Sequence, residues 1–333
     1  MSAPAPSMFS AAARQVAEQL QLTMGKANQD VFAQTLLELA RADQDIVIVT
    51  SDSRGSGKLV PFAEALPKQI IEVGIAEQNL VGIAAGLASV DKNVFAISPA
   101  CFLTARSFEQ IKNDVAYSDN PVTLVGISAG VSYGALGSTH YSLHDLAALR
   151  AVNNISILVP ADNHETRAAV QLARSMNTPV YLRIGKAPTY HLPNAAALEL
   201  GKARVINPGD DAAFIATGET VIHALLAAKY LEITEGMRCR VISMPSIKPL
   251  DTQAILAAAT QCRAVITVEE HMVHGGLGEA CAAVIAQANS QCRFNIVGIP
   301  DEYTVTGSQA DIFRHYGISM EGLAEIMRKL WEV

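Results

Sequence analysis

The chain lacks several features that define large functional classes. Its 333 residues contain no cluster of Lys and Arg and carry a formal net charge of −7. Because neutralising nucleic acid phosphates needs clustered basic side chains, we expect no nucleic acid partner. No apolar run reaches the ~18 residues that cross a bilayer, so we expect no membrane association. The N-terminus has no basic segment followed by a long apolar run, which argues against a secretory signal.

Cysteines are few and scattered along the chain. The five cysteines form no C-x-x-C pair and lie at Cys101, Cys239, Cys262, Cys281 and Cys292. An odd, dispersed set in an acidic chain is typical of reduced thiols, so we expect a soluble cytoplasmic protein. The same spacing predicts no cysteine-based metal site.

Apolar residues make up half of the chain, which is enough for two large cores at this length. Short β-branched runs alternate with amphipathic helical patterns through both halves. Continuous apolar strands joined by helical crossovers indicate parallel sheets with helices on both faces. The expected fold class is α/β, with two three-layer α/β/α domains built on mostly parallel sheets.

The pattern divides the chain into four segments. We predict an N-terminal extension over 1–24, a first α/β domain over 25–186, a linker over 187–200 and a second α/β domain over 201–333. The linker prediction rests on KAPTYHLPNAAALEL, which has two prolines and no strand pattern. The first ~20 residues are expected to be partly disordered or to lie against a partner.

The segment Glu72–Ala88, EVGIAEQNLVGIAAGLA, is the most informative stretch. It places one acid, Glu77, between an apolar strand and a helix rich in Gly and Ala. Another backbone can approach such a helix closely, so the surroundings of Glu77 are expected to be dry. A carboxyl held there is costly to ionise, which suits a group that shares or donates a proton. The alternative is a surface acid stabilised by the dipole of the helix start.

This string resembles the motif with which transketolases and 1-deoxyxylulose-phosphate synthases hold the aminopyrimidine ring of thiamine diphosphate. The resemblance implies that Glu77 is a catalytic and cofactor-binding residue that hydrogen-bonds the ring nitrogen N1′. It extends over residues ~25–333, judged by the usual sizes of domains. It implies a pyrimidine-binding domain of the thiamine diphosphate fold, followed by a transketolase C-terminal domain.

Two aromatic residues follow in the segment Ser98–Ile111, SPACFLTARSFEQI. The pattern F-L-T-x-R-x-F-x-Q is similar to the transketolase segment whose aromatic side chains pack on the pyrimidine ring. The resemblance implies that Phe102 and Phe108 form this ring pocket, since a flat heteroaromatic ring needs stacking partners. The alternative is that both are ordinary core aromatics.

A Gly- and Ser-rich turn, TSDSRGSGK, follows a predicted strand over 46–50. The end of a parallel strand is where α/β proteins bind ligands. The resemblance implies that Asp52 lies near the cofactor and Ser56 near a substrate phosphate. The alternative is a helix-capping Asp in a solvent-exposed loop.

The segment Gly126–His144, GISAGVSYGALGSTHYSLH, is long for a connection between a strand and a helix. Long ordered loops of this kind often carry function. His140 and His144 have the i, i+4 spacing seen in zinc sites, but no Glu lies between them and no third ligand is evident. The resemblance instead implies that His140, in the string G-S-T-H, is a catalytic residue that contacts the substrate.

The same loop departs from the pattern of sugar-phosphate transketolases. They usually carry His near the position of Ser128, and Glu-Asp where this chain has Ala135 and Leu136. That Asp contacts a sugar hydroxyl, and losing a hydrogen-bonding partner of this kind should change specificity strongly. We therefore expect Ser128 and Tyr133 to contact a substrate other than the usual pentose phosphates.

Arg183 ends the last strand of the first domain, in VYLRIGK. The resemblance implies that it binds the substrate phosphate, and a guanidinium fork also suits sulfonate or carboxylate. The alternative is an ion pair at the rim of the site. In the second domain, the Gly-rich turn of TVEEHMVHGGLGEA is expected to be a packing feature rather than an anion site.

The G-D-G segment and distant Asn that hold the cofactor's metal in this family are missing from the sequence. The resemblance therefore implies one subunit of a split transketolase, with Mg²⁺ (or Ca²⁺) held by a separate N-terminal, diphosphate-binding chain in an α₂β₂ assembly. The expected activity is transfer of a two-carbon ketol unit from a ketose, a sugar or sugar phosphate, to an aldehyde acceptor. The alternatives are the beta subunit of a 2-oxo-acid dehydrogenase and a non-catalytic assembly subunit.

Overall fold

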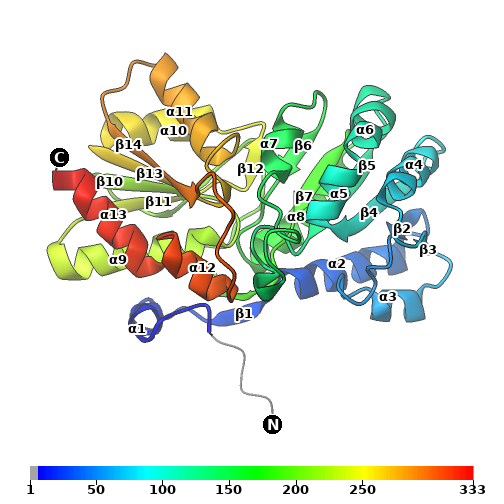
Figure 1. Ribbon diagram of the computed structural model, residues 1–333, viewed down its shortest axis with the longest axis horizontal. Coiled ribbons are helices and arrows are strands. Elements are labelled where there is room, and N and C mark those ends of the chain that lie inside the picture. Colours follow the sequence, from blue (N-terminus) through cyan, green and yellow to red (C-terminus); the bar gives the residue numbers. More distant parts are fainter. Residues whose placement is uncertain (1–6, 333) are drawn as a thin grey trace, which may run out of the picture.

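A computed structural model describes residues 7–332 of the chain. Two α/β lobes, each built on one large sheet, lie side by side (Figure 1). Within the described residues, no helix combines the length and the apolar character needed to cross a bilayer.

The first lobe is built on a seven-stranded sheet in the order β12-β6-β7-β5-β4-β2-β3. All neighbouring strands are parallel except the edge strand β12, which runs antiparallel to β6. The strands are β2 (Ile46–Thr50), β3 (Ile70–Glu72), β4 (Asn93–Pro99), β5 (Val122–Ile127), β6 (Ser156–Leu158), β7 (Val180–Arg183) and β12 (Ser246–Lys248). Every residue of β2 and β5 is buried, as expected for parallel strands covered on both faces.

The helices of the first lobe pack on both faces of this sheet. They are α2 (Asn28–Ala42), α3 (Val60–Ala65), α4 (Glu77–Ala88), α5 (Ala100–Arg106), α6 (Phe108–Gln110), a π-helix η1 (Ile111–Tyr117), a 3₁₀ turn η2 (Gly134–Leu136), α7 (Asp145–Arg150) and α8 (Asn163–Ser175). Asp162 begins α8 by accepting a hydrogen bond from the backbone N–H of Glu165, which satisfies one free donor of the helix start.

The second lobe is built on a five-stranded sheet in the order β14-β13-β10-β11-β9, parallel except for β9. Its strands are β9 (Arg204–Asn207), β10 (Ala212–Ala216), β11 (Cys239–Ser243), β13 (Ala264–Met272) and β14 (Arg293–Ile299). Its helices are α9 (Thr220–Glu235), α10 (Thr252–Gln261), α11 (Leu277–Gln287), α12 (Gln309–His315) and α13 (Met320–Glu332). The mostly parallel α/β fold class predicted from the sequence is therefore confirmed for both lobes.

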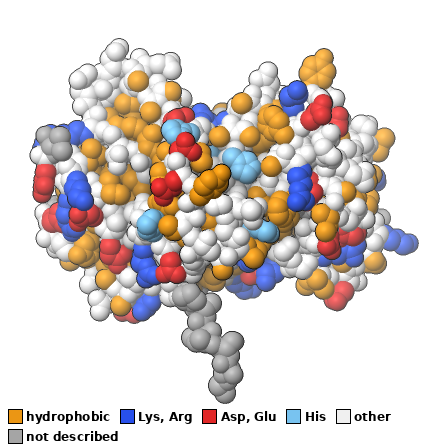
Figure 2. Space-filling view, in the orientation of Figure 1, with side chains coloured by type: hydrophobic (Ala, Val, Ile, Leu, Met, Phe, Trp, Pro, Cys, Tyr) orange, Lys and Arg blue, Asp and Glu red, His pale blue; other side chains and the backbone are white. Residues whose placement is uncertain are grey.

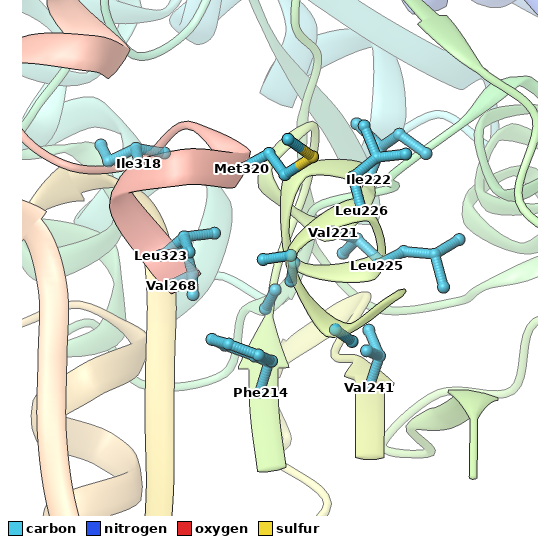
Figure 3. Packing of buried hydrophobic residues seen from close by; sticks show 14 of the residues in the cluster. Phe214, Val221, Ile222, Leu225, Leu226, Val241, Val268, Ile318, Met320 and Leu323 are labelled. Atoms are coloured by element: carbon cyan, nitrogen blue, oxygen red, sulfur yellow. The ribbon is translucent and has the colours of Figure 1, made fainter. Parts of the chain in front are cut away.

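Helix α9 is apolar on nearly all sides because it is covered on nearly all sides. Its side chains belong to a cluster of buried apolar residues. Figure 3 shows this cluster, to which β10 contributes Phe214, β13 contributes Val268, and α13 contributes Met320 and Leu323. Helix α1 (Ala11–Gln19) packs on α9 as well. The core of the second lobe is thus a helix enclosed between a sheet and two other helices.

Both segments outside the lobes contain secondary structure that the sequence analysis did not predict. The expected strandless linker contains β8 (Pro188–Tyr190), which pairs with β1 (Met24–Ala27). The N-terminal extension lies on the chain itself, because the apolar side chains around α1, led by Phe9 and Val16, join the core of the second lobe. Residues 1–6, to which the expectation of disorder also applied, lie outside the described residues.

Candidate active site

Four of the predicted site residues follow neighbouring strands of the first sheet. The chain runs from β2 to the edge strand β3 and then returns to β4 on the other side of β2. Asp52 follows β2, Glu77 opens the helix after β3, Phe102 follows β4, and Ser128 follows β5. Parallel strands end at one edge of a sheet, and the point where strand order reverses is where such sheets bind ligands. The topology therefore places these residues along one edge of the sheet.

Glu77 is the first residue of α4 and is only 4% exposed. Nη1 of Arg106 donates to both of its carboxylate oxygens, each at 3.0 Å. The start of the helix also favours a negative charge at this place. The carboxyl is buried as expected, but it has a counter-charge that the sequence analysis did not foresee.

Arg106 also covers the ring of Phe102, with its guanidinium carbon 4.2 Å from the ring centroid. Both residues lie on α5, four positions apart, which places their side chains on the same helix face. The sequence carried this signal in FLTAR, where an arginine follows an aromatic residue by one turn. Arg106 is the main site residue that the sequence analysis missed.

Phe108 is separated from Phe102 by a break in the helix at Ser107. It is 36% exposed and lines a surface groove together with Lys112 and Tyr117, in which neither Phe102 nor Glu77 takes part. The chain by itself does not bring the two phenylalanines together. A role of Phe108 in the ring pocket stays a prediction.

The loop that carries His140, residues 128–144, reaches back to Phe102. The ring of His140 lies 5.4 Å from that of Phe102 and 5.6 Å from that of Tyr133, both in edge contact. Nζ of Lys186 lies 5.0 Å from the Tyr133 ring centroid. Three predicted site residues therefore form one aromatic cluster. Nowhere in residues 7–332 do three His, Cys, Asp or Glu side chains group as a metal site.

The phenol of Tyr133 is half-buried within this cluster. Burial raises its pKa above the ordinary value, an effect partly offset by the nearby hydroxyl of Ser128. Tyr133 therefore stays protonated at neutral pH, and its hydroxyl keeps a proton to donate.

Ser128 is buried beneath the surface of the protein. Its side chain is 1% exposed and donates to Oε1 of Gln29 at 3.3 Å. Its φ of 51° turns the chain sharply as it leaves β5. In this conformation the Ser128 hydroxyl is directed at the neighbouring helix α2, and its contact with a substrate stays a prediction.

Asp52 and Ser56 lie in an open loop. Asp52 has a φ of 50°, and its backbone N–H donates to Oε1 of Glu72 at 2.6 Å. Ser56 is exposed, and its hydroxyl donates to the carbonyl of Ser53 at 3.2 Å. Leu59, not Asp52, stands at the N-cap of α3. The side chains of Asp52 and Ser56 are accessible, and their cofactor and substrate roles stay predictions.

Arg183 corrects the sequence analysis most clearly. Its side chain is 5% exposed, and its Nε donates to Oδ2 of Asp145 at 2.8 Å. Its Nη2 donates to the carbonyls of Ser142 and Glu270, both at 2.9 Å. Its ion pair is buried rather than at the rim of the site, because the second lobe covers the end of β7. In this conformation the guanidinium is engaged within the chain, and a contact with a substrate phosphate stays a prediction.

Several carboxyl groups of the second lobe are buried near Arg183, where the two lobes meet. Glu269 accepts hydrogen bonds from the N–H groups of Leu277 and Gly278, so the anion at the Gly-rich helix start belongs to the chain itself. Burial raises the pKa of both Glu269 and Glu270 to about 7, and that of Glu219 well above its usual range. The sequence showed these acids but gave no sign that they are buried.

Comparisons with known proteins agree with this geometry. The transketolase pyrimidine-binding domain matches residues 24–190, and the transketolase C-terminal domain matches residues 201–323. The chain is 48% identical over 296 residues to an apulose-4-phosphate transketolase subunit of Phocaeicola vulgatus, across 88% of this chain and 94% of that protein. It is 32% identical over 306 residues to a 6-deoxy-6-sulfo-D-fructose transketolase subunit of Clostridium sp., across 92% and 94%.

A solved structure, described as a split gene transketolase in an inactive beta4 tetramer, has the same fold. It is 34% identical with a TM-score of 0.84, covering 92% of this chain and 99% of that one. The transketolase names of these relatives favour that family over the 2-oxo-acid dehydrogenases. The chain therefore belongs to the transketolase family, as a subunit that carries the pyrimidine-binding and C-terminal domains of a split, thiamine diphosphate-dependent transferase.

Proposed function

We propose that Glu77 is the residue with which this subunit holds the pyrimidine nitrogen N1′ during two-carbon ketol transfer. The observation that carries this proposal is a buried carboxyl at a helix start, beside the half-buried face of Phe102, at the ligand edge of a parallel sheet. An acceptor and an aromatic face side by side are what a flat, nitrogen-containing ring requires.

A side chain of the protein already occupies the place proposed for such a ring. The guanidinium of Arg106 is flat, hydrogen-bonds Glu77 and lies on Phe102. A planar group with a nitrogen at its edge therefore already satisfies both contacts, which supports a site suited to an aminopyrimidine. When bound, thiamine diphosphate supplies the nucleophilic carbon that carries the two-carbon unit.

The remaining roles belong to this chain's own side chains. Glu77 holds a proton shared with N1′, and Phe102 fixes the plane of the ring. His140, which lies between Phe102 and Tyr133, contacts the substrate, and the protonated Tyr133 offers it a hydrogen bond. Asp52, in the accessible loop after β2, also lies near the bound cofactor.

The second half of the site belongs to a partner. We propose an N-terminal, diphosphate-binding chain that holds Mg²⁺ (or Ca²⁺), joined to this one in an α₂β₂ assembly. The Phocaeicola relative is named as one subunit of its transketolase, which supports a second chain. The tetramer of the related split transketolase supports self-association.

We propose that the donor is a ketose with an anionic group, with apulose 4-phosphate as the first candidate because of the 48% identical relative. Leu136, 56% exposed, presents an apolar side chain where a sugar hydroxyl would need an acceptor. Because Arg183 is buried and Arg106 is paired with Glu77, the accessible cation left beside the aromatic cluster is Lys186. Lys186 therefore replaces Arg183 as the proposed partner of the anionic group.

Reconstitution tests this function. The chain is purified alone and together with a candidate diphosphate-binding chain from the same organism, and each sample is assayed with thiamine diphosphate and Mg²⁺. Donors are apulose 4-phosphate, 6-deoxy-6-sulfo-D-fructose and an unphosphorylated ketose, with an aldehyde acceptor. Ketol transfer by the pair but not by the chain alone is expected. Turnover by the chain alone, or oxo-acid decarboxylation by the pair, would contradict the proposal.

A further inference from the structure

The His140 loop, residues 128–144, is closed at its base by backbone hydrogen bonds. The N–H of Ser142 donates to the carbonyl of Gly130 at 2.9 Å, and the N–H of Ala129 donates to the carbonyl of Ile184 at 3.1 Å. This narrow base, formed by residues 129–131 on one side and 142–143 on the other, sets the direction in which His140 and Tyr133 project.

One residue of the second lobe is linked to both sides of this base, to one directly and to the other through Arg183. Oε1 of the buried Glu270, on β13, accepts the backbone N–H of Val131 at 2.8 Å. The carbonyl of Glu270 accepts Nη2 of Arg183 at 2.9 Å, and the same Nη2 donates to the carbonyl of Ser142 at 2.9 Å. The side chain of Glu270 thus holds residues 129–131, where the loop begins. Its backbone carbonyl is linked through Arg183 to residues 142–143, where the loop ends.

Close packing leaves little room for another arrangement. Gly130 has a φ of 63°, and a Cβ there would overlap the carboxyl of Glu270. The next residues of β13 continue the contact, since the N–H of Met272 donates to the carbonyl of Leu143 at 3.1 Å. The end of β13 therefore follows the base of the loop along its length.

Glu270 also links this base to a second loop. Its Oε1 accepts Nε2 of Gln309, at the start of α12, at 2.8 Å. A Cβ at Gly134, in the His140 loop, would lie 3.0 Å from the carbonyl oxygen of Gly307. In Figure 1 the green loop after β5 and the orange loop after β14 lie side by side in the middle of the molecule. Figure 2 shows histidine, acidic and hydrophobic side chains gathered on this face.

We infer that Glu270 is a positioning residue for the active site, through which the C-terminal domain fixes the His140 loop in the conformation that presents His140 and Tyr133. The inference rests on the proposed function of that loop. It gives the C-terminal domain a defined task, because the position of the His140 loop then depends on a side chain of that domain.

Hydrogen exchange of the full chain, without substrate or cofactor, tests the inference. Glu270→Ala should speed exchange of the amides of residues 129–143 at least about tenfold, which corresponds to losing roughly 1.4 kcal/mol of local protection. Glu270→Gln keeps an acceptor oxygen and should restore most of the protection. Gln309→Leu leaves Glu270 in place and should give a smaller acceleration in the same segment. In all three variants, β2 and α4 should exchange as in the wild type.

Activity of the assembled two-chain enzyme gives the second readout. Glu270→Ala should raise KM for the ketose more than it lowers kcat, and Glu270→Gln should recover most of this loss. Unchanged exchange of the loop in Glu270→Ala, or acceleration spread evenly over both lobes, would overturn the inference. Hydrogen exchange is measured without turnover, so it tests the positioning role separately from the activity. If Glu270→Ala loosens the loop but the assembled enzyme transfers no ketol unit, the proposed function is contradicted and the positioning role is not.

Discussion

Arg106 and Glu77 form an ion pair in which one nitrogen, Nη1, lies 3.0 Å from both carboxylate oxygens. The same guanidinium lies 4.2 Å from the ring centroid of Phe102. One cation therefore occupies both contacts that we assign to the pyrimidine ring. On this assignment the ring would bind only after Arg106 moves aside, and about half of the Arg106 side chain is already exposed to solvent.

This pairing predicts a coupled effect on stability. Arg106→Met should lower the free energy of unfolding by about 1–3 kcal/mol, because the buried carboxylate loses its charged donor. In a Glu77→Gln background the same change should cost much less. Urea denaturation of the four chains measures the coupling. Arg167→Met, which removes an exposed ion pair with Glu38, serves as the control and should have a small effect. Strictly additive effects of the two substitutions would show that the pair does not form.

Lys186 should govern recognition of the anionic group. Lys186→Gln should raise KM for a phosphorylated ketose about tenfold and leave kcat nearly unchanged, as expected when an interaction is equal in ground and transition states. An unphosphorylated ketose should show no such change. Steady-state kinetics of the reconstituted enzyme measures both, with the exposed Lys68→Gln as a matched control. An equal effect on both donors would place the anionic group elsewhere.

His223 should make stability depend on pH. It is enclosed by the rings of Phe9 and Phe313, and burial lowers its pKa from 6.5 to about 4. Between these values the unfolded chain binds a proton that the folded chain does not. Stability contributed by this site is therefore present above about pH 6.5 and is lost as pH falls towards 4, by about 3 kcal/mol in total.

A comparison between variants isolates this effect. The buried Glu269 and Glu270, with a pKa raised to about 7, bind protons in the folded state and act in the opposite direction. His223→Leu should therefore lose less stability than the wild type between pH 6.5 and 4.5, in denaturant titrations at several pH values. The exposed His315→Gln should follow the wild type. Parallel curves for wild type and His223→Leu would contradict the burial of a neutral imidazole.

The sequence predicted the parallel strands well because each is a short, continuous apolar run. The predicted strand over 46–50 coincides with β2, and Glu77 lies at the start of α4, between a strand and a helix as expected. The edge strands β9 and β12 and the short strand β8 were missed. Each has only three or four residues and is held extended by pairing with a strand that is distant in sequence. No local sequence pattern reveals such a pairing.

The site was predicted as far as individual residues, but not as far as their partners. Phe102, Tyr133 and His140, each proposed separately, lie together in the structure, whereas the predicted pairing of Phe102 with Phe108 is not seen in this chain alone. Arg183 was misplaced because its burial depends on the second lobe, which covers the end of β7 only in three dimensions. Glu270 was overlooked for the same reason. A buried acid and a surface acid look alike in a sequence.

Replacing Glu77 tests the central claim most directly. In the enzyme reconstituted with its diphosphate-binding partner, Glu77→Gln keeps the size of the side chain but removes the carboxyl that shares a proton with N1′. We predict a loss of kcat of at least about a hundredfold, with the assembly intact by size-exclusion chromatography. The exposed Glu109→Gln, on α6, should turn over like the wild type. Turnover by Glu77→Gln within a few-fold of the wild type would contradict the account.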